Sequence, residues 1–155
     1  MWVRPNLSIV HIAELTSVLA CSLFAGAAVY VNLVEHPARM ECGVEIAATE
    51  FRPSYRRGTI MQATLATLGL LSSITAWLAG ATFWWLIAGV LLGSVVPFTL
   101  IVILPTNKRL LDPALDPGSA EATALLARWG RLHAVRTGLG TLALVLLGLH
   151  LVGVR

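Results

Sequence analysis

Four long apolar stretches, separated by shorter polar segments, dominate the pattern of the chain. They cover about residues 8–34, 58–79, 83–104 and 135–154. A bilayer core about 30 Å thick requires roughly 20 apolar residues per helix, so each stretch is long enough to cross it. An open sheet would leave backbone groups unpaired in lipid, and the stretches lack the alternation of a barrel strand. The pattern therefore predicts an all-α protein in which residues 1–155 form a single domain, an integral membrane four-helix bundle.

Local signals refine this bundle. Only residues 80–82 separate the second and third stretches, which predicts an antiparallel helical hairpin. Ser119 follows a run of turn residues and can cap a helix that begins near Ala120 and continues into the fourth stretch. Pro97 lacks a backbone N–H and is expected to kink the third helix.

Small residues indicate close packing between the helices. Gly89 and Gly93 form a GxxxG pattern, which lets two membrane helices approach each other closely. Packing within the bundle is the favoured interpretation of this pattern. A contact between two copies of the chain, and hence a homo-oligomer, is the alternative.

Composition and charge narrow the class of protein. Hydrophobic residues make up 57% of the chain and charged residues 12%, with a mean hydropathy of +0.79. Soluble domains carry about a quarter charged residues, so an ordinary soluble protein is excluded. The net charge of +3 comes from arginines that flank the apolar stretches, and no continuous basic face suggests a nucleic-acid partner. Cys21 and Cys42 fall at different depths, and no disulfide between them is expected.

Lysine and arginine are distributed unevenly along the chain. Nine of the 11 lie in or beside the two long polar segments: Arg39, Arg52, Arg56, Arg57, Lys108, Arg109, Arg128, Arg131 and Arg136. The positive-inside rule then places both long segments in the cytoplasm and both termini together on the other side. We expect the lipid bilayer of a bacterial inner membrane as the surroundings.

Side chains able to do chemistry gather at the cytoplasmic ends of three predicted helices. They are Glu35 and His36 after the first stretch, Asn107 after the third, and Trp129, His133 and Arg136 before or within the fourth. In a helix, Trp129, His133 and Arg136 follow i, i+4, i+7 spacing and share one face.

Two interpretations of this face remain open. In the first, Trp129 and the arginines anchor the helix at the interface, His133 is hydrogen-bonded there, and Glu35 pairs with Arg39. In the second, His133 accepts a proton at the mouth of a pocket between the helices. Arg136 and Asn107 would then stabilise negative charge on a substrate oxygen.

A second cluster is predicted at the opposite face. His11 and Glu14 are neighbours on one helix face, and His150 lies near the end of the fourth stretch. Two histidines and a carboxylate match the ligands of zinc or non-haem iron, provided that the first and fourth helices are adjacent. The alternative is that these are interfacial residues and that Glu14 bonds to a neighbouring helix.

Four short motifs occur in order along the chain: EHPAR at 35–39, PFT at 97–99, PTN at 105–107 and RWGRLHAVR at 128–136. In these motifs the chain resembles a family of small four-span membrane proteins that includes the anthrone-oxygenase-like proteins of polyketide pathways. The resemblance covers nearly the whole chain. It implies an oxidase or oxygenase that converts a small hydrophobic aromatic, such as an anthrone, by base-assisted reaction with dioxygen.

The resemblance also suggests roles for individual residues. His133 would be the base, and Arg136 and Asn107 would be the partners of the oxyanion. Glu35 and His36 would orient these groups or relay protons. Trp129, Tyr30 and Thr99 would contact a flat substrate. This interpretation requires no cofactor. Two alternatives stay open: a non-catalytic binding or assembly subunit for a lipid, quinone or partner helix, and a metal-dependent membrane enzyme.

Overall fold

The computed structural model describes residues 7–153, and within this range the chain is helical and contains no strand. The first rod joins α1 (Leu7–Tyr30), the π-helical turn η1 (Val31–Glu35) and α2 (His36–Glu41), and the second rod is α3 (Val44–Leu78). The third rod joins α4 (Phe83–Gly93), α5 (Val95–Phe98), the π-helical turn η2 (Thr99–Ile103) and α6 (Leu104–Leu110). The fourth rod is α7 (Ala120–Leu151), so the all-α prediction is confirmed.

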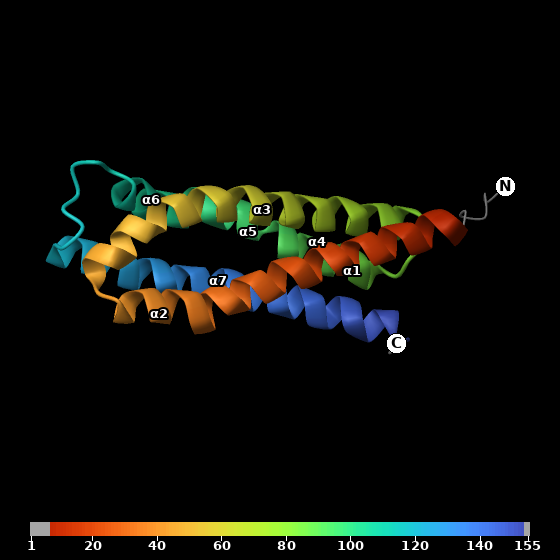
Figure 1. Ribbon diagram of the computed structural model, residues 1–155. Coiled ribbons are helices and arrows are strands. Elements are labelled where there is room, and N and C mark those ends of the chain that lie inside the picture. Colours follow the sequence, from red (N-terminus) through yellow and green to blue (C-terminus); the bar gives the residue numbers. More distant parts are fainter. Residues whose placement is uncertain (1–6, 154–155) are drawn as a thin grey trace.

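The rods run up and down in sequence order and form a four-helix bundle (Figure 1). α1 packs on α3 and α7, and α4 packs on the same two helices, so the first and fourth rods are neighbours. The start of α1, the end of α7 and the short turn between α3 and α4 lie at one end of the bundle (Figure 1). The chain termini themselves fall outside residues 7–153, and their common side of a membrane stays a prediction.

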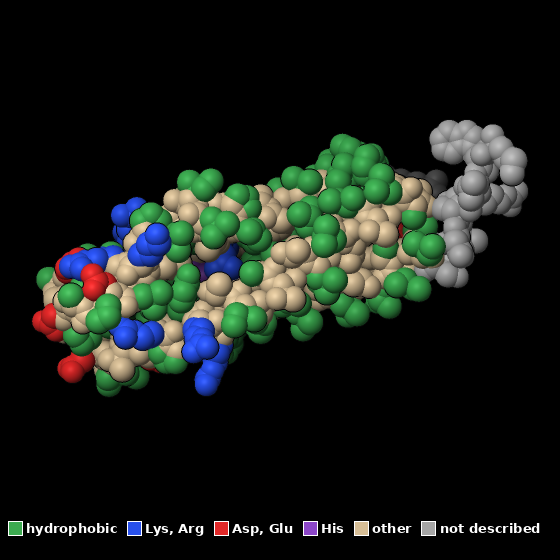
Figure 2. Space-filling model, turned by 90° about the horizontal axis from the view of Figure 1, so that it is seen from above, with side chains coloured by type: hydrophobic (Ala, Val, Ile, Leu, Met, Phe, Trp, Pro, Cys, Tyr) green, Lys and Arg blue, Asp and Glu red, His purple; other side chains and the backbone are tan. Residues whose placement is uncertain are grey.

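All four rods are long and apolar enough to cross a membrane. Charged side chains gather at the end of the bundle that holds α2, the start of α3 and the connection between α6 and α7 (Figure 2). We call this the charged end. Along the rest of the rods, large hydrophobic side chains such as Leu33 and Ile101 are exposed, as expected for helices whose solvent is lipid.

The helices continue past the apolar stretches that revealed them. α3 begins at Val44 and α7 at Ala120, whereas the apolar pattern begins near residues 58 and 135. Hydropathy marks the lipid-facing part of a helix, but a helix also persists where only one face is apolar. In α7 the residues before the apolar stretch bury Ala122 and Leu126 every fourth position, and the Ser119 hydroxyl accepts from the Ala122 N–H as predicted.

Both π-helical turns end two residues before a proline. η1 precedes Pro37 and η2 precedes Pro105. A proline has no N–H to donate, and its ring clashes with the carbonyl four residues earlier, so the preceding turn widens to i→i−5 bonds. Pro97 has a related effect, because the helix is interrupted at Ser94, one turn before it. The third rod is therefore interrupted close to Pro97, where the sequence predicts a kink.

Gly89 and Gly93 bring α4 against α3. A Cβ on Gly89 would lie 2.4 Å from the Ser73 Cβ, and one on Gly93 would lie 2.7 Å from a Leu70 methyl group. Ser73 in turn shares a 2.6 Å hydrogen bond with Ser17 of α1. The GxxxG pattern thus serves packing within the bundle, as favoured from the sequence.

Candidate functional site

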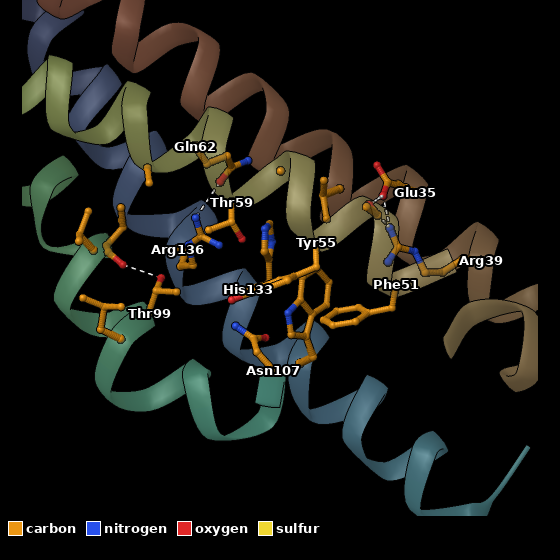
Figure 3. Close-up of a pocket in the computed structure, with 18 residues that line it drawn as sticks. Glu35, Arg39, Phe51, Tyr55, Thr59, Gln62, Thr99, Asn107, His133 and Arg136 are labelled. Atoms are coloured by element: carbon orange, nitrogen blue, oxygen red, sulfur yellow. Dashed lines mark hydrogen bonds and ion pairs between the residues drawn. The ribbon is translucent and has the colours of Figure 1, made fainter. Parts of the chain in front are cut away.

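A cavity of about 130 Å³ lies between the rods toward the charged end. This volume is well above the roughly 10–15 Å³ that a single water needs. Its lining comes from η1, α2, α3, α5, η2, α6 and α7, so every rod of the bundle contributes (Figure 3). The two π-helical turns both take part, in keeping with the frequent occurrence of such turns at functional sites.

Most of the predicted site residues meet at this cavity. Glu35, Thr99, Asn107, Trp129, His133 and Arg136 all line it. His36 and Tyr30 do not. The Tyr30 side chain is 55% exposed on the surface of α1, so the structure does not place Tyr30 at this cavity, where its substrate contact was expected. Tyr30 stands one residue before η1, and the wider π-helical turn places Val31 and Glu35 on the wall instead.

His133 is buried, with 3% of its surface exposed, and is held by Asn32 of η1. The Nδ1 atom of His133 lies 2.5 Å from the Asn32 Oδ1 atom. The same oxygen accepts a 2.6 Å hydrogen bond from the Thr137 hydroxyl, while the Asn32 amide nitrogen donates to the Gly130 carbonyl at 3.2 Å. This network joins η1 to α7 and fixes the plane of the imidazole.

Arg136 lies one helical turn further along α7. Its Nη2 atom donates to the Gln62 Oε1 atom of α3 at 2.9 Å (Figure 3). Its guanidinium stands 5.7 Å from the centre of the Phe24 ring. Among residues 7–153, Arg136 forms no ion pair with a carboxylate. A cation drawn this far into a bundle without a carboxylate is suited to a ligand with negative charge.

The opposite wall carries its own ion-pair cluster. Arg39 pairs with Glu35, as predicted, and also with Glu50 at 3.1 Å. Ser54 donates to the Glu35 carboxylate at 3.1 Å. The positive charge of Arg39 is thereby balanced within the protein, whereas that of Arg136 is not.

Three aromatic side chains form a column beside the cavity. Trp129 stacks on His133 with ring centres 4.8 Å apart, and His36 also packs on Trp129, with ring centres 5.2 Å apart. Phe51 meets Trp129 edge-on at 5.3 Å. The column explains how His36, although outside the lining, contacts the site through Trp129.

Asn107 has unsatisfied hydrogen-bonding capacity at the cavity. The side chain is 1% exposed, and its Oδ1 atom has no hydrogen-bond partner among the described residues. A buried polar atom without a partner costs free energy, and such atoms are common where a ligand completes the bonding. The Oδ1 atom of Asn107 is therefore available to accept a hydrogen bond from a guest molecule.

An ion-pair network near Asn107 ties α6 to α7. Arg109 forms a two-point contact with Glu121, with distances of 2.6 and 2.9 Å, and reaches Asp112 at 2.6 Å. The Ala114 N–H also donates to Asp112, and these bonds lower the pKa of the Asp112 carboxyl. The network connects the segment that carries Asn107 to the helix that carries His133.

The cavity opens on the side of the bundle. Thr59 and Ala63 of α3 and Leu100 of η2 line it and are also exposed, so the opening lies between these two elements. Figure 2 looks onto this face and shows a hollow with Lys or Arg and His side chains at its bottom. The opening lies on the lateral face of rods that are apolar enough to cross a membrane, and not on the charged end itself.

The predicted metal site at the other end is not assembled. His11 is exposed, and His150 bonds to the Leu146 carbonyl at 2.9 Å and packs on Trp84. Across the described part of the chain, no group of three His, Cys, Asp or Glu side chains is close enough to hold a metal ion. His11, Glu14 and His150 therefore do not form one set of three ligands, although α1 and α7 are neighbours as that site required.

Several residues of the site were missed from the sequence. Asn32 and Gln62 matter most, since they hold His133 and Arg136, and Phe51, Ser54, Tyr55 and Thr59 of α3 add to the wall. A signal was present for the first two. The chain has only four Asn or Gln residues, and Asn32 and Gln62 lie inside apolar stretches, where amides are rare and usually bonded or functional.

Comparisons with known proteins identify the family to which the chain is similar. A family model described as anthrone oxygenase matches residues 51–146. The anthrone oxygenase tpcL of Aspergillus fumigatus is 31% identical over 143 residues, covering 86% of this chain and 89% of the relative. The anthrone oxygenase AgnL2 of Paecilomyces divaricatus is 29% identical over 147 residues, covering 81% of this chain and 86% of the relative. No solved structure matches the chain significantly. Both relatives are fungal, so the expected bacterial membrane stays a prediction.

Proposed function

The chain belongs to the anthrone oxygenase family, and from this premise we propose that it is a membrane-embedded enzyme that oxidises a small, anthrone-like aromatic with dioxygen. The observation that carries the proposal is the convergence of an imidazole, a guanidinium and a buried amide on one cavity. His133, Arg136 and Asn107 supply these groups. Oxidation of an acidic methylene group requires a base and a stabiliser for the resulting anion, which these groups can provide.

The first step is removal of a proton. In an anthrone, the methylene group between two aryl rings is conjugated with a ketone, so loss of its proton gives an extended enolate. His133 accepts this proton as the general base. Arg136 and the amide nitrogen of Asn107, not its unpartnered Oδ1 atom, donate hydrogen bonds to the enolate oxygen, and in a site sheltered from water such donors stabilise charge strongly.

The second step is reaction with dioxygen. The enolate gives up electrons to dioxygen, a carbon–oxygen bond forms at the former methylene carbon, and loss of water leaves a second ketone. Overall the methylene group becomes a carbonyl group. One oxygen atom enters the product, and the other leaves as water with the two methylene hydrogens. An electron-rich enolate can react with dioxygen without an obligatory metal, so the proposal requires no cofactor.

The walls and the opening suit a flat hydrophobic substrate that dissolves in the bilayer. Trp129 and Phe51 provide aromatic surface, and Thr99 stands on the opposite side of the cavity. We propose that the substrate enters from lipid between α3 and η2. Glu35 holds Arg39 in place, and His36 orients His133 through Trp129, so both residues act by positioning.

Turnover in purified protein tests the proposal. The full chain in lipid nanodiscs is supplied with anthrone, and oxygen uptake is measured together with anthraquinone formation, above the rate in protein-free nanodiscs. We expect His133→Gln to lower kcat about 10²–10⁴-fold and Arg136→Gln about 10²–10³-fold. His150→Gln is the matched control, since it replaces a histidine far from the cavity, and its rate should equal that of the wild type.

Three outcomes would contradict the proposal. An unchanged rate in His133→Gln would remove the base. Absence of any turnover, with a lipid or quinone bound in the purified protein, would favour the non-catalytic binding subunit. Stoichiometric metal whose removal abolishes turnover would favour the metal-dependent enzyme.

A further inference from the structure

The hydrogen bonds around His133 contain information on which of its two ring nitrogens carries the proton. A neutral imidazole has one N–H and one bare nitrogen, and only the bare nitrogen can act as a base. The partner of the first nitrogen decides which form is present. For His133 this partner is the side chain of Asn32.

The orientation of the Asn32 amide follows from its contact with Gly130. The Gly130 carbonyl oxygen can only accept a hydrogen bond, so the atom 3.2 Å from it must be the amide nitrogen of Asn32. The carbonyl oxygen of the same amide then faces His133 and Thr137, at 2.5 and 2.6 Å. With the amide reversed, two acceptors would face each other at Gly130.

The Asn32 oxygen in turn fixes the proton on His133. This oxygen has no hydrogen to give, so the Nδ1 atom of His133 must be the donor. In the neutral ring, Nε2 is then the bare nitrogen. His133 lines the cavity, and Nε2 has no hydrogen-bond partner within the described chain, which leaves its lone pair for a guest molecule.

From this network we propose that Asn32 is a positioning residue that holds His133 in the Nδ1–H form and presents Nε2 as the base. The role in catalysis rests on the proposed function, whereas the tautomer itself does not. An asparagine performs this task without adding charge. Arg136, Arg39 and His36 are the titratable groups near the ring, and Glu35 also lines the cavity. An aspartate at position 32 would favour the charged imidazolium, which is no longer a base.

Nitrogen-15 NMR of the full chain in lipid bilayers tests the tautomer directly, because protonated and bare ring nitrogens have well separated shifts. The chain has only four histidines, and His133→Gln assigns the signal of interest by its loss. At alkaline pH, where the ring is neutral, we expect a protonated Nδ1 and a bare Nε2. Asn32→Leu should replace this pattern with a mixture of tautomers or with Nε2–H.

Two further variants separate the tautomer from the general integrity of the fold. Thr137→Val removes the hydroxyl that shares the Asn32 oxygen but leaves the contact with His133, so the Nδ1–H form should persist. Asn32→Asp keeps an acceptor at Nδ1 and should keep this nitrogen protonated. In turnover of anthrone, Asn32→Leu should lower kcat about 10–100-fold with little change in KM, and Asn32→Asp should recover part of the loss near alkaline pH.

The outcomes distinguish this inference from the proposed function. A bare Nδ1 in the wild type, or a tautomer that is unaffected in a folded Asn32→Leu variant, would overturn the role of Asn32. The expected tautomer shift on Asn32→Leu would support it even in the absence of anthrone turnover, and that absence would count against the proposed function alone.

Discussion

Gly130 of α7 offers a sharp test of how the helices position the site. A Cβ added to this residue would lie 2.6 Å from the Nε2 atom and 2.8 Å from the Cδ2 atom of His36. Ordinary contact begins near 3.4 Å, so in Gly130→Ala the His36 ring must retreat by about 0.8 Å. His36 packs on Trp129, and Trp129 stacks on His133, so the retreat is transmitted along the aromatic column.

The expected magnitudes separate activity from stability. Overpacking costs about 1–3 kcal/mol, but alanine is favoured over glycine in a helix by about 1 kcal/mol, which leaves a net loss of roughly 0–2 kcal/mol. A misplacement of about 1 Å at a catalytic site can lower the rate about 10²-fold. Gly130→Ala should therefore lower kcat for anthrone about 10–100-fold, while Tm in nanodiscs falls by no more than about 8 °C.

Gly138→Ala is the matched control for this experiment. Gly138 is in the same helix, and a Cβ there would meet nothing within 4 Å, so the variant should keep full activity and a Tm equal to or above that of the wild type. The double variant Gly130→Ala with His36→Ala should be less impaired than the sum of the single effects, since the clash is gone. Full activity of Gly130→Ala, or an equal loss in Gly138→Ala, would refute the reasoning.

Further predictions address packing, substrate entry and topology. Gly89→Ala should lower Tm through its clash with Ser73, and Ser73→Gly in the same chain should restore it; no change in Tm would contradict the packing of α4 on α3. Leu100→Trp narrows the lateral opening and should raise KM for anthrone with little effect on kcat. Ile101→Trp should not, because Ile101 is also exposed but does not line the cavity; equal effects would argue against this route. Cys42 is exposed at the charged end, which the positive-inside rule places in the cytoplasm. In intact cells a membrane-impermeant thiol reagent should therefore label Cys42 only after permeabilisation, and labelling before that would reverse the predicted sidedness.

The bundle was largely predictable because lipid imposes a simple rule. Each crossing helix must be apolar over its length, and the four apolar stretches reveal this directly. Helix ends at the charged end were not predictable in the same way. The first two helices meet at a tight turn through Gly43, whose φ is 97°, where the polar composition had suggested a longer loop.

The site was predictable in part, for a physical reason that differs between residues. His133, Arg136 and Asn107 are costly at the edge of an apolar stretch, so the sequence alone could single them out as candidate site residues, and all three line the cavity. Tyr30, by contrast, lies outside the cavity, one residue before the π-helical turn whose Val31 and Glu35 line the wall, and its substrate contact stays a prediction. The contribution of α3 required knowledge of which helices are neighbours, and sequence spacing does not provide it.

A structure of the protein crystallised from lipid with anthraquinone, the product of the proposed reaction, tests the central claim most directly. The account predicts the rings between α3, η2 and α7, with one carbonyl oxygen within hydrogen-bond distance of Arg136 or Asn107 and the opposite carbon facing the Nε2 atom of His133. An anthraquinone bound elsewhere on the bundle, with this cavity filled only by lipid or water, would contradict it.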